Sequence, residues 1–213
     1  MKELLNKIHH ADCLSFMKQL PDKCIDLVLT DPPYGIKRDK GFGGFGAPIA
    51  RKQYKGEWDL ERPSQEYFDE MLRVSKSAII FGGNFFADLL PVGNHWLVWD
   101  KLNTMPTFGD CELAWTNIKR NSVKKIVHEY NGLLGKEEER FHATQKPLQL
   151  FKKCIQHSKL ETGIVLDCFS GSGTTALACH DLGLDFICIE KDADYHAASV
   201  ERLEQHKRQL RLI

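Results

Sequence analysis

The sequence lacks the long apolar run that a membrane-spanning helix requires. No stretch approaches about 18 consecutive apolar residues, and residues 1–7 contain no hydrophobic segment typical of a secretory signal. We therefore expect a cytoplasmic protein with no membrane partner. With 16 glycines and 8 prolines in 213 residues, the chain is also too poor in these residues for a collagen-like or low-complexity protein.

The chain also lacks an excess of charge of either sign and any closely spaced pair of cysteines. Its 29 Lys and Arg residues balance its 29 Asp and Glu residues. This balance excludes a protein that is basic throughout, but it allows a local basic surface for nucleic acid. The seven cysteines form no Cys-x-x-Cys pair, and their spacing is irregular. We therefore expect reduced thiols and no metal site.

What the sequence does contain is an alternation of short apolar runs with amphipathic stretches. The runs are typical of strands covered on both faces, and we predict strands over Ile25–Thr30, Ser77–Phe81, His95–Trp99, Cys111–Thr116, Ile164–Cys168 and Asp185–Ile189. The amphipathic stretches predict helices over Leu14–Leu20, Gln65–Ser75, Leu148–Ser158, Thr174–Leu182 and Ala193–Leu210.

This order of elements predicts a single α/β domain over residues 1–213, with a mostly parallel sheet and helices on both faces. Between Ser77 and Thr116 few helices separate the strands, so we expect some antiparallel pairing there. The segments Gly35–Trp58 and Lys119–Phe141 have no clear secondary-structure pattern. Long loops in a compact domain are usually functional or disordered.

A glycine-rich segment, Val165–Thr175, joins a predicted strand to a predicted helix. Gly171 and Gly173 let the backbone pass close to a ligand, and the helix start offers free N–H groups. No Lys follows the second glycine, so the segment is not a P-loop. Glu190 lies 19 residues after Gly171, which suits an acid that binds both ribose hydroxyls. These features favour an adenosine-containing cofactor, although the glycines alone also fit a tight turn with a helix cap.

A second segment, Asp31-Pro32-Pro33-Tyr34, directly follows the predicted strand Ile25–Thr30. Two prolines cannot continue a central strand, so we expect a rigid turn at the sheet edge where α/β proteins bind ligands. Asp31 and the Pro32 carbonyl can accept both N–H bonds of an amino group on a planar base. They would thereby stabilise the positive charge that develops on its nitrogen, while Tyr34 stacks on the ring. The alternative is an Asp-capped turn with an exposed Tyr.

These segments resemble those of a known family. Asp31–Tyr34 followed by Phe169-Ser170-Gly171-Ser172-Gly173 is similar to the amino-group DNA methyltransferases that use S-adenosylmethionine. The order, with the catalytic tetrapeptide first and the cofactor loop last, resembles their permuted beta group. His142–Pro147 resembles the family's His-x-Thr-Gln-Lys-Pro segment, and Ala11-Asp12-Cys13 resembles its Gly-Asp-Cys segment. The resemblance spans nearly the whole chain.

The resemblance implies a Rossmann-like methyltransferase fold with circularly permuted motif order and a seven-stranded sheet, in which a strand over Lys7–His10 follows Asp185–Ile189 in space. It implies a catalytic role for the turn formed by Asp31, Pro32, Pro33 and Tyr34. It also implies contacts to the cofactor's adenine, ribose and methionine parts by Asp12, Cys13, Gln145, Lys146, Asp167, Phe169, Gly171, Gly173, Thr174, Glu190 and Lys191. In this set Glu190 would bind the ribose, and Gln145 and Lys146 would lie near the methionine carboxylate.

The implied reaction is in-line transfer of the sulfonium methyl group to the exocyclic amine of a base flipped out of a DNA duplex. No metal is expected, because a sulfonium is already a good leaving group. Asp31 at the first position favours N6 of adenine, with N4 of cytosine as the alternative. Residues 35–58 and 117–141 are expected to contact DNA and to form a small target-recognition region, although solvated loops fit equally well. Their candidate DNA-binding residues are Lys37, Arg38, Arg51, Lys52, Lys55, Lys119, Arg120, Lys124 and Lys125.

The expected partner is double-stranded DNA, whereas a second copy of the chain and a cognate restriction enzyme of a restriction-modification system are left open. The main rival is a Rossmann-type oxidoreductase. It would explain the glycine loop and Glu190, but not Asp31–Tyr34 or His142–Pro147. A DNA-binding subunit without catalysis would have no need of the complete Asp31–Tyr34 segment.

Overall fold

The structure is a computed structural model that describes residues 1–36, 61–103, 109–130 and 145–209. Within these ranges, eight strands form one sheet in the order β1-β8-β7-β2-β3-β5-β4-β6. The strands are β1 (Lys7–His10), β2 (Ile25–Thr30), β3 (Ser75–Phe81), β4 (Trp96–Asp100), β5 (Cys111–Thr116), β6 (Lys124–Val127), β7 (Ile164–Asp167) and β8 (Asp185–Glu190). The helices are η1 (Lys2–Leu4), α1 (Cys13–Met17), α2 (Gln65–Val74), η3 (Gly83–Phe85), α3 (Leu148–Ser158), α4 (Thr174–Leu182) and α5 (Ala193–Gln209).

The strands β1, β8, β7, β2 and β3 are neighbours and run parallel. Their carboxyl ends therefore lie along one edge of the sheet, which we call the carboxyl edge. Strand β5 runs antiparallel to both β3 and β4, so β5 begins and β4 ends at this same edge. Segments that are distant in sequence are brought together there.

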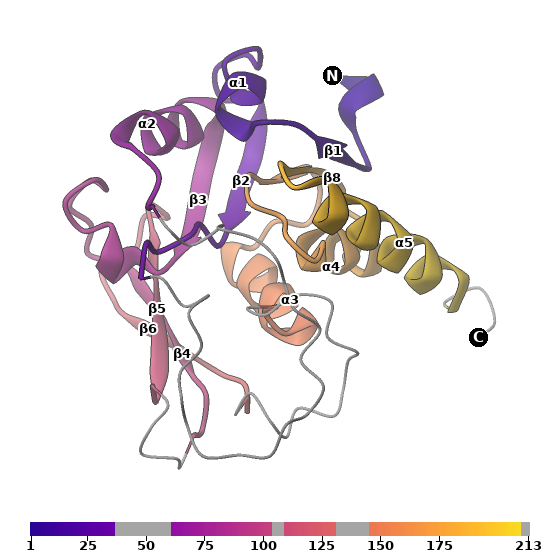
Figure 1. The fold of residues 1–213 in the computed structure, drawn as a ribbon. Coiled ribbons are helices and arrows are strands. Elements are labelled where there is room, and N and C mark those ends of the chain that lie inside the picture. Colours follow the sequence, from indigo (N-terminus) through magenta and orange to yellow (C-terminus); the bar gives the residue numbers. More distant parts are fainter. Residues whose placement is uncertain (37–60, 104–108, 131–144, 210–213) are drawn as a thin grey trace.

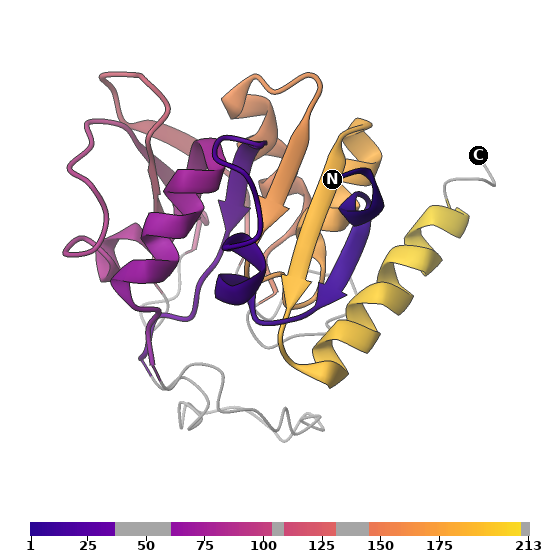
Figure 2. The same cartoon turned by 90° about the horizontal axis from the view of Figure 1, so that it is seen from above.

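The first strand of the chain lies beside the last one. Strand β1 pairs with β8, with His10 opposite Glu190, and α5 runs alongside them (Figure 2). This pairing confirms the neighbouring strand that was expected over Lys7–His10. It also places Asp12, which follows β1, close to the end of β8.

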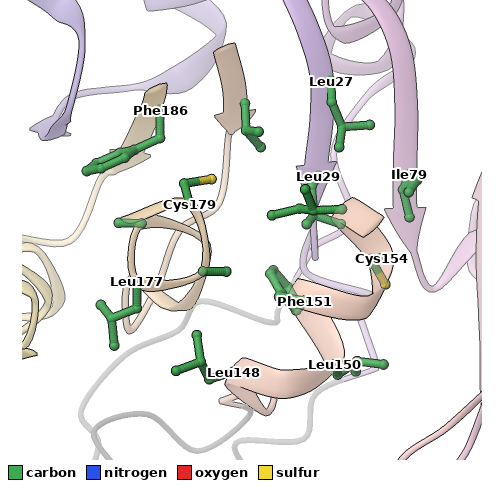
Figure 3. Close-up of a cluster of buried hydrophobic side chains, with 14 of the residues drawn as sticks. Leu27, Leu29, Ile79, Leu148, Leu150, Phe151, Cys154, Leu177, Cys179 and Phe186 are labelled. Atoms are coloured by element: carbon green, nitrogen blue, oxygen red, sulfur yellow. The ribbon is translucent and has the colours of Figure 1, made fainter. Parts of the chain in front are cut away.

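Apolar side chains fill both faces of the sheet. Helices α1 and α2 lie on one side of the sheet, and α3 and α4 lie on the other (Figure 1). Leu27 and Leu29 of β2 belong to a cluster with residues of α3 and α4, whereas Ile25 and Val28 pack with residues of α1 and α2. Figure 3 shows Leu29 and Phe151 within the first cluster. Burial on both faces explains why these strands read as continuous apolar runs.

The sheet has one strand more than the seven that were expected. Strand β6 pairs in parallel with β4 at the margin of the sheet and falls within Lys119–Phe141, where no element was predicted. Its four residues include Lys124 and Lys125. Charged side chains are common on edge strands, but they interrupt the apolar run by which a strand is recognised in a sequence.

The other expected elements are present, with ends shifted by at most three residues. The antiparallel pairing predicted between Ser77 and Thr116 is confirmed by β5. None of the described helices is long and apolar enough to span a bilayer.

Candidate active site

A cavity of about 770 Å³ follows the carboxyl edge across three neighbouring strands. Glu190 lines it after β8, residues 167–172 line it after β7, and Asp31 with Tyr34 line it after β2. The glycine loop and the Asp-Pro-Pro-Tyr turn, which are more than 130 residues apart in sequence, therefore form one site.

The glycine loop turns sharply between β7 and α4. Gly171 and Gly173 have φ angles of +48° and +76°, in the left-handed region that favours glycine. The Gly173 N–H donates to the Ser170 carbonyl at 2.8 Å, which closes the turn. Arg202 of α5, a buried residue, donates to the Ser172 carbonyl at 2.9 Å from behind the loop. The loop is therefore held rigidly at the cavity wall.

The Glu190 carboxylate is oriented by backbone amides. Its two oxygens accept hydrogen bonds from the N–H groups of Gly171 and Asp192, each at 2.8 Å. Burial raises the pKa of Glu190, and these amides oppose the rise. Since each oxygen keeps further acceptor capacity, a fixed carboxylate at this position fits the two hydroxyls of a ribose.

Two other buried polar groups on the cavity wall fit a polar ligand. The Ser170 hydroxyl is buried with no hydrogen-bond partner among the described residues, a situation that is rare in proteins without a ligand or water to satisfy it. Asp167 accepts hydrogen bonds from Thr30 at 2.7 Å, from the Phe169 N–H at 3.1 Å and from Thr175. Burial nevertheless raises the pKa of Asp167 to about 6.

In the Asp31–Tyr34 turn, each carboxylate oxygen of Asp31 has one polar partner and keeps further acceptor capacity. Oδ1 accepts from the Tyr34 hydroxyl at 2.6 Å, and Oδ2 contacts Lys146 Nζ at 2.5 Å. Burial raises the pKa of Asp31, while the Lys146 charge opposes this rise. Burial lowers the pKa of Lys146, but Asp31, Tyr34 and Glu112 outweigh it and raise that pKa well above its usual range. The two groups form a close ion pair on the cavity wall.

Lys146 lines the cavity, and the place beside the cofactor carboxylate that the resemblance implied stays a prediction. Its ammonium lies between Asp31 and Glu112, with the latter at 3.2 Å. Two half-buried carboxylates attract a buried ammonium strongly, which accounts for this placement. Its carbonyl accepts a hydrogen bond from Thr174 at 3.3 Å, so its backbone still contacts the start of α4.

The Tyr34 ring is enclosed by residues that follow β3. It stacks on Phe85, with ring centres 4.8 Å apart and planes 16° apart, and it meets Phe86 edge-on. Gly82, with φ +68°, approaches so closely that a Cβ there would lie 2.2 Å from a ring carbon of Tyr34. The alternative of a turn with an exposed Tyr therefore does not describe this structure.

The remaining cofactor candidates are placed as follows. Asp12 lines the cavity but also caps α1, where it accepts from the Ser15 N–H at 2.9 Å. Cys13 is buried beside it, and burial raises its pKa to about 12. Gly173 packs against Ser199 of α5. The candidates that line the cavity with Asp12 and Cys13 are Gln145, Lys146, Asp167, Phe169, Gly171, Thr174, Glu190 and Lys191.

Four of the nine candidate DNA-binding residues belong to the part of the chain that the structure describes. Lys37, Arg38, Arg51, Lys52 and Lys55 lie outside the described residues. Lys119 and Arg120 follow the end of β5, at the sheet edge opposite Asp31, where they line a separate cavity. Lys124 and Lys125 lie on the outermost strand, β6. The structure therefore does not join these last four residues to the cavity that contains Asp31.

Several site residues had no recognisable signal in the sequence. Glu112 and Lys101 contact each other at 2.6 Å beside Lys146, and Tyr67 lines the cavity near Asp12. The sequence signal that could have indicated a role for Glu112 is its charge near the start of the otherwise uncharged strand Cys111–Thr116. Gly82 and Arg202 act by supporting other residues, and no motif contains them.

The close approach of Gly82 to Tyr34 gives a testable prediction. Gly82→Ala should lower the free energy of unfolding by about 1–3 kcal/mol more than Gly183→Ala, because the new methyl group overpacks the Tyr34 ring. Gly183 is a matched control, since it has φ +69° but nothing within 4 Å of a Cβ. Urea unfolding of both variants measures the difference, and equal losses would contradict the role given to Gly82.

Comparison with known proteins agrees with this geometry. A model of the DNA methylase family matches residues 91–201, more than half of the chain. The Type II methyltransferase M.HinfI of Haemophilus influenzae is 26% identical over 97% of this chain and 70% of its own length. The Type II methyltransferase M2.MboI of Moraxella bovis is also 26% identical, over 93% of this chain and 87% of its own length.

Solved structures are similar as well. The crystal structure of the M1.HpyAVI-SAM complex has a TM-score of 0.63 and 26% identity, and covers 92% of this chain and 98% of that one. The cytosine-N4-specific PvuII DNA methyltransferase has a TM-score of 0.59 at 18% identity, over 95% of this chain and 91% of that one, which shows the fold alone. The chain therefore belongs to the DNA methylase family, as an N6-adenine or N4-cytosine DNA methyltransferase whose cofactor is S-adenosylmethionine.

Proposed function

We propose that the protein methylates N6 of adenine in a short duplex site. The observation that carries this proposal is the single cavity that joins Glu190, oriented by backbone amides, to the buried carboxylate of Asp31. Asp in the first position of Asp31–Tyr34 favours adenine over cytosine, as the resemblance to the family implies. N4 of cytosine is the second candidate, because its amine has the same geometry.

The cavity residues suit distinct parts of the cofactor. When bound, S-adenosylmethionine supplies an electrophilic methyl group on a positively charged sulfur. Glu190 would bind the ribose hydroxyls, and Asp12, Cys13 and Lys191 would lie beside the adenine. Asp167, Phe169, Gly171 and Thr174 would hold the methionine part with Gln145, and we add the unsatisfied Ser170 hydroxyl to this group.

The catalytic turn would bind the target amine. Asp31 and the Pro32 carbonyl would accept its two N–H bonds, which directs the nitrogen lone pair toward the methyl group and stabilises the developing positive charge. The two prolines hold these acceptors in place, and Tyr34, stacked on Phe85, would border the flipped base. Lys146 would keep Asp31 ionised in its buried position.

The single domain over residues 1–213 would take its DNA contacts from the basic residues of 35–58, together with a small target-recognition region in 117–141. The first of these segments begins directly after Asp31–Tyr34, and Glu61, three residues beyond its end, lines the cavity. Membership of the permuted beta group and of a restriction-modification system is part of this proposal, supported by the motif order and by the Type II relatives.

Product analysis tests the proposed function. The protein would be incubated with duplex DNA of mixed sequence and labelled S-adenosylmethionine, and the DNA then digested to nucleosides and separated by chromatography. We expect the label in N6-methyladenine. Label in N4-methylcytosine would overturn the choice of base, and unlabelled DNA would overturn the activity. Binding of NAD in place of S-adenosylmethionine would favour the oxidoreductase rival.

Replacing the catalytic carboxylate should separate catalysis from cofactor binding. Asp31→Ala should lower the methyl-transfer rate by a factor of about 10² or more, because it removes a positioned acceptor of developing charge. Affinity for S-adenosylmethionine should change little, since Lys146 keeps Glu112 as a partner. Single-turnover kinetics and calorimetry measure the two effects, and near-normal turnover would refute the role of Asp31.

Glu190→Ala should change the affinity for the cofactor, whereas Asp31→Ala should change the methyl-transfer rate. It should weaken S-adenosylmethionine binding by roughly 2–4 kcal/mol, because a carboxylate that accepts two hydroxyl hydrogen bonds is lost. Glu161→Ala, a change of the same type at an exposed position, should leave the affinity unchanged. Calorimetry on both variants measures the difference, and equal affinities would exclude a ribose contact by Glu190.

A further inference from the structure

Four charged side chains form a row that leads away from the catalytic turn. Lys146 Nζ lies 2.5 Å from Asp31 Oδ2 and 3.2 Å from Glu112 Oε2, and Lys101 Nζ lies 2.6 Å from Glu112 Oε1. Each side chain is at most 20% exposed. Negative and positive charges therefore alternate from Asp31, just after β2, through Lys146, two residues before α3, to Glu112 of β5 and Lys101, just after β4.

We propose that Glu112 and Lys101 are positioning residues that determine, through Lys146, how much negative charge Asp31 presents to the target amine. The inference rests on the proposed function, because it concerns the same reaction at the same carboxylate. Neither residue is among those that line the cavity. Their influence on the amine would pass through the Lys146 ammonium.

The need for a second carboxylate follows from the two demands placed on Asp31. It must remain ionised although it is buried, which requires a cation nearby. It must also stabilise positive charge on the amine, which a fully compensating cation would oppose. Charges interact strongly in an environment with little water, so an ammonium bound to Asp31 alone would cancel much of its charge. Glu112 shares the ammonium and leaves Asp31 part of its negative potential.

Lys101 completes the row by keeping Glu112 ionised. Burial alone would raise the pKa of Glu112, but Lys146 and Lys101 together lower it to about 2. Lys101 is held in place over the Trp99 ring, 4.9 Å from the ring centre. Glu112 therefore stays negative, and Lys146 keeps two counter-charges.

Two other titratable groups face Asp31. Tyr34 donates to its Oδ1, and burial raises the pKa of this phenol well above its usual range, so Tyr34 stays neutral. Asp167 lies on the neighbouring strand β7, where it accepts hydrogen bonds from Thr30, Thr175 and the Phe169 amide. The charge of Glu112 also acts on Asp31 directly and raises its pKa, so only the double-mutant cycle below tests the path through Lys146.

The pH dependence of methyl transfer supplies a test with opposite signs. Glu112→Gln removes a negative charge, so the pKa of Asp31 should fall. The acid limb of the pH profile, where the single-turnover rate falls because Asp31 becomes protonated, should therefore move to lower pH. Its plateau rate should drop by about tenfold. A change of this size corresponds to an interaction free energy within the range found for residues in contact. Lys101→Met removes a positive charge, so the acid limb should move to higher pH. A merely structural defect would lower the plateau in both variants without moving the limb.

A double-mutant cycle tests whether Glu112 acts through Lys146. In a Lys146→Met background, Glu112→Gln should cause no further drop in the plateau rate, because the ammonium that connects the carboxylates is gone. Additive losses, or limbs that do not move in opposite directions, would overturn the inference. If Lys146→Met fails to fold, the opposite shifts of the two single variants still test whether Glu112 and Lys101 set the charge of Asp31, and shifts in the same direction would overturn the inference.

Controls separate this inference from the proposed function. Calorimetry should show unchanged S-adenosylmethionine affinity in Glu112→Gln and Lys101→Met. Lys76→Met removes a lysine from an exposed ion pair with Asp26 and should change neither the plateau nor the limb. If the unmodified protein transfers no methyl group to DNA, the proposed function fails. If it does so and the variants behave additively, only the inference fails.

Discussion

The parallel pairing of β1, β8, β7, β2 and β3 is the constraint on which the site depends. Parallel strands end at the same edge, so each loop that follows one of them begins beside its neighbours. The antiparallel strand β5 reaches this edge with its first residues instead of its last. In this way Glu112, near the amino end of one strand, meets Asp31, just beyond the carboxyl end of another, with Lys146 between them.

Two buried acids at this edge show how partners determine charge. Asp167 is surrounded by hydroxyl and amide donors, and burial raises its pKa to about 6. Glu112 is buried between two lysines, and its pKa falls to about 2 despite burial. Neutral donors only reduce the cost of burying a charge, whereas a cation at short distance reverses it. Asp31 lies between these cases, since the Lys146 ammonium that it contacts is shared with Glu112.

Much of the fold could be read from local pattern, and the failures have identifiable causes. The bounds of β2, β5, α3 and α4 agree with those predicted, because apolar runs and helix-forming patterns are local properties of the chain. Strand β6 was missed because two of its four residues are lysines. The ionic partners of Lys146 had no local signal either, because Glu112 lies 34 positions and Asp31 lies 115 positions away in sequence.

The sequence by itself determined the chemistry that the site can perform: a carboxylate and a proline carbonyl in a rigid turn, a glycine loop, and an acid spaced for a ribose. These features are short, and their geometry depends on neighbours within a few residues. The tertiary structure alone decided which charges meet. Lys101, Glu112, Lys146 and Asp31 come from four separate segments, and the Gly82 backbone meets Tyr34 only when β3 lies beside β2. Electrostatic coupling depends on distance in space, and strand order and register set that distance.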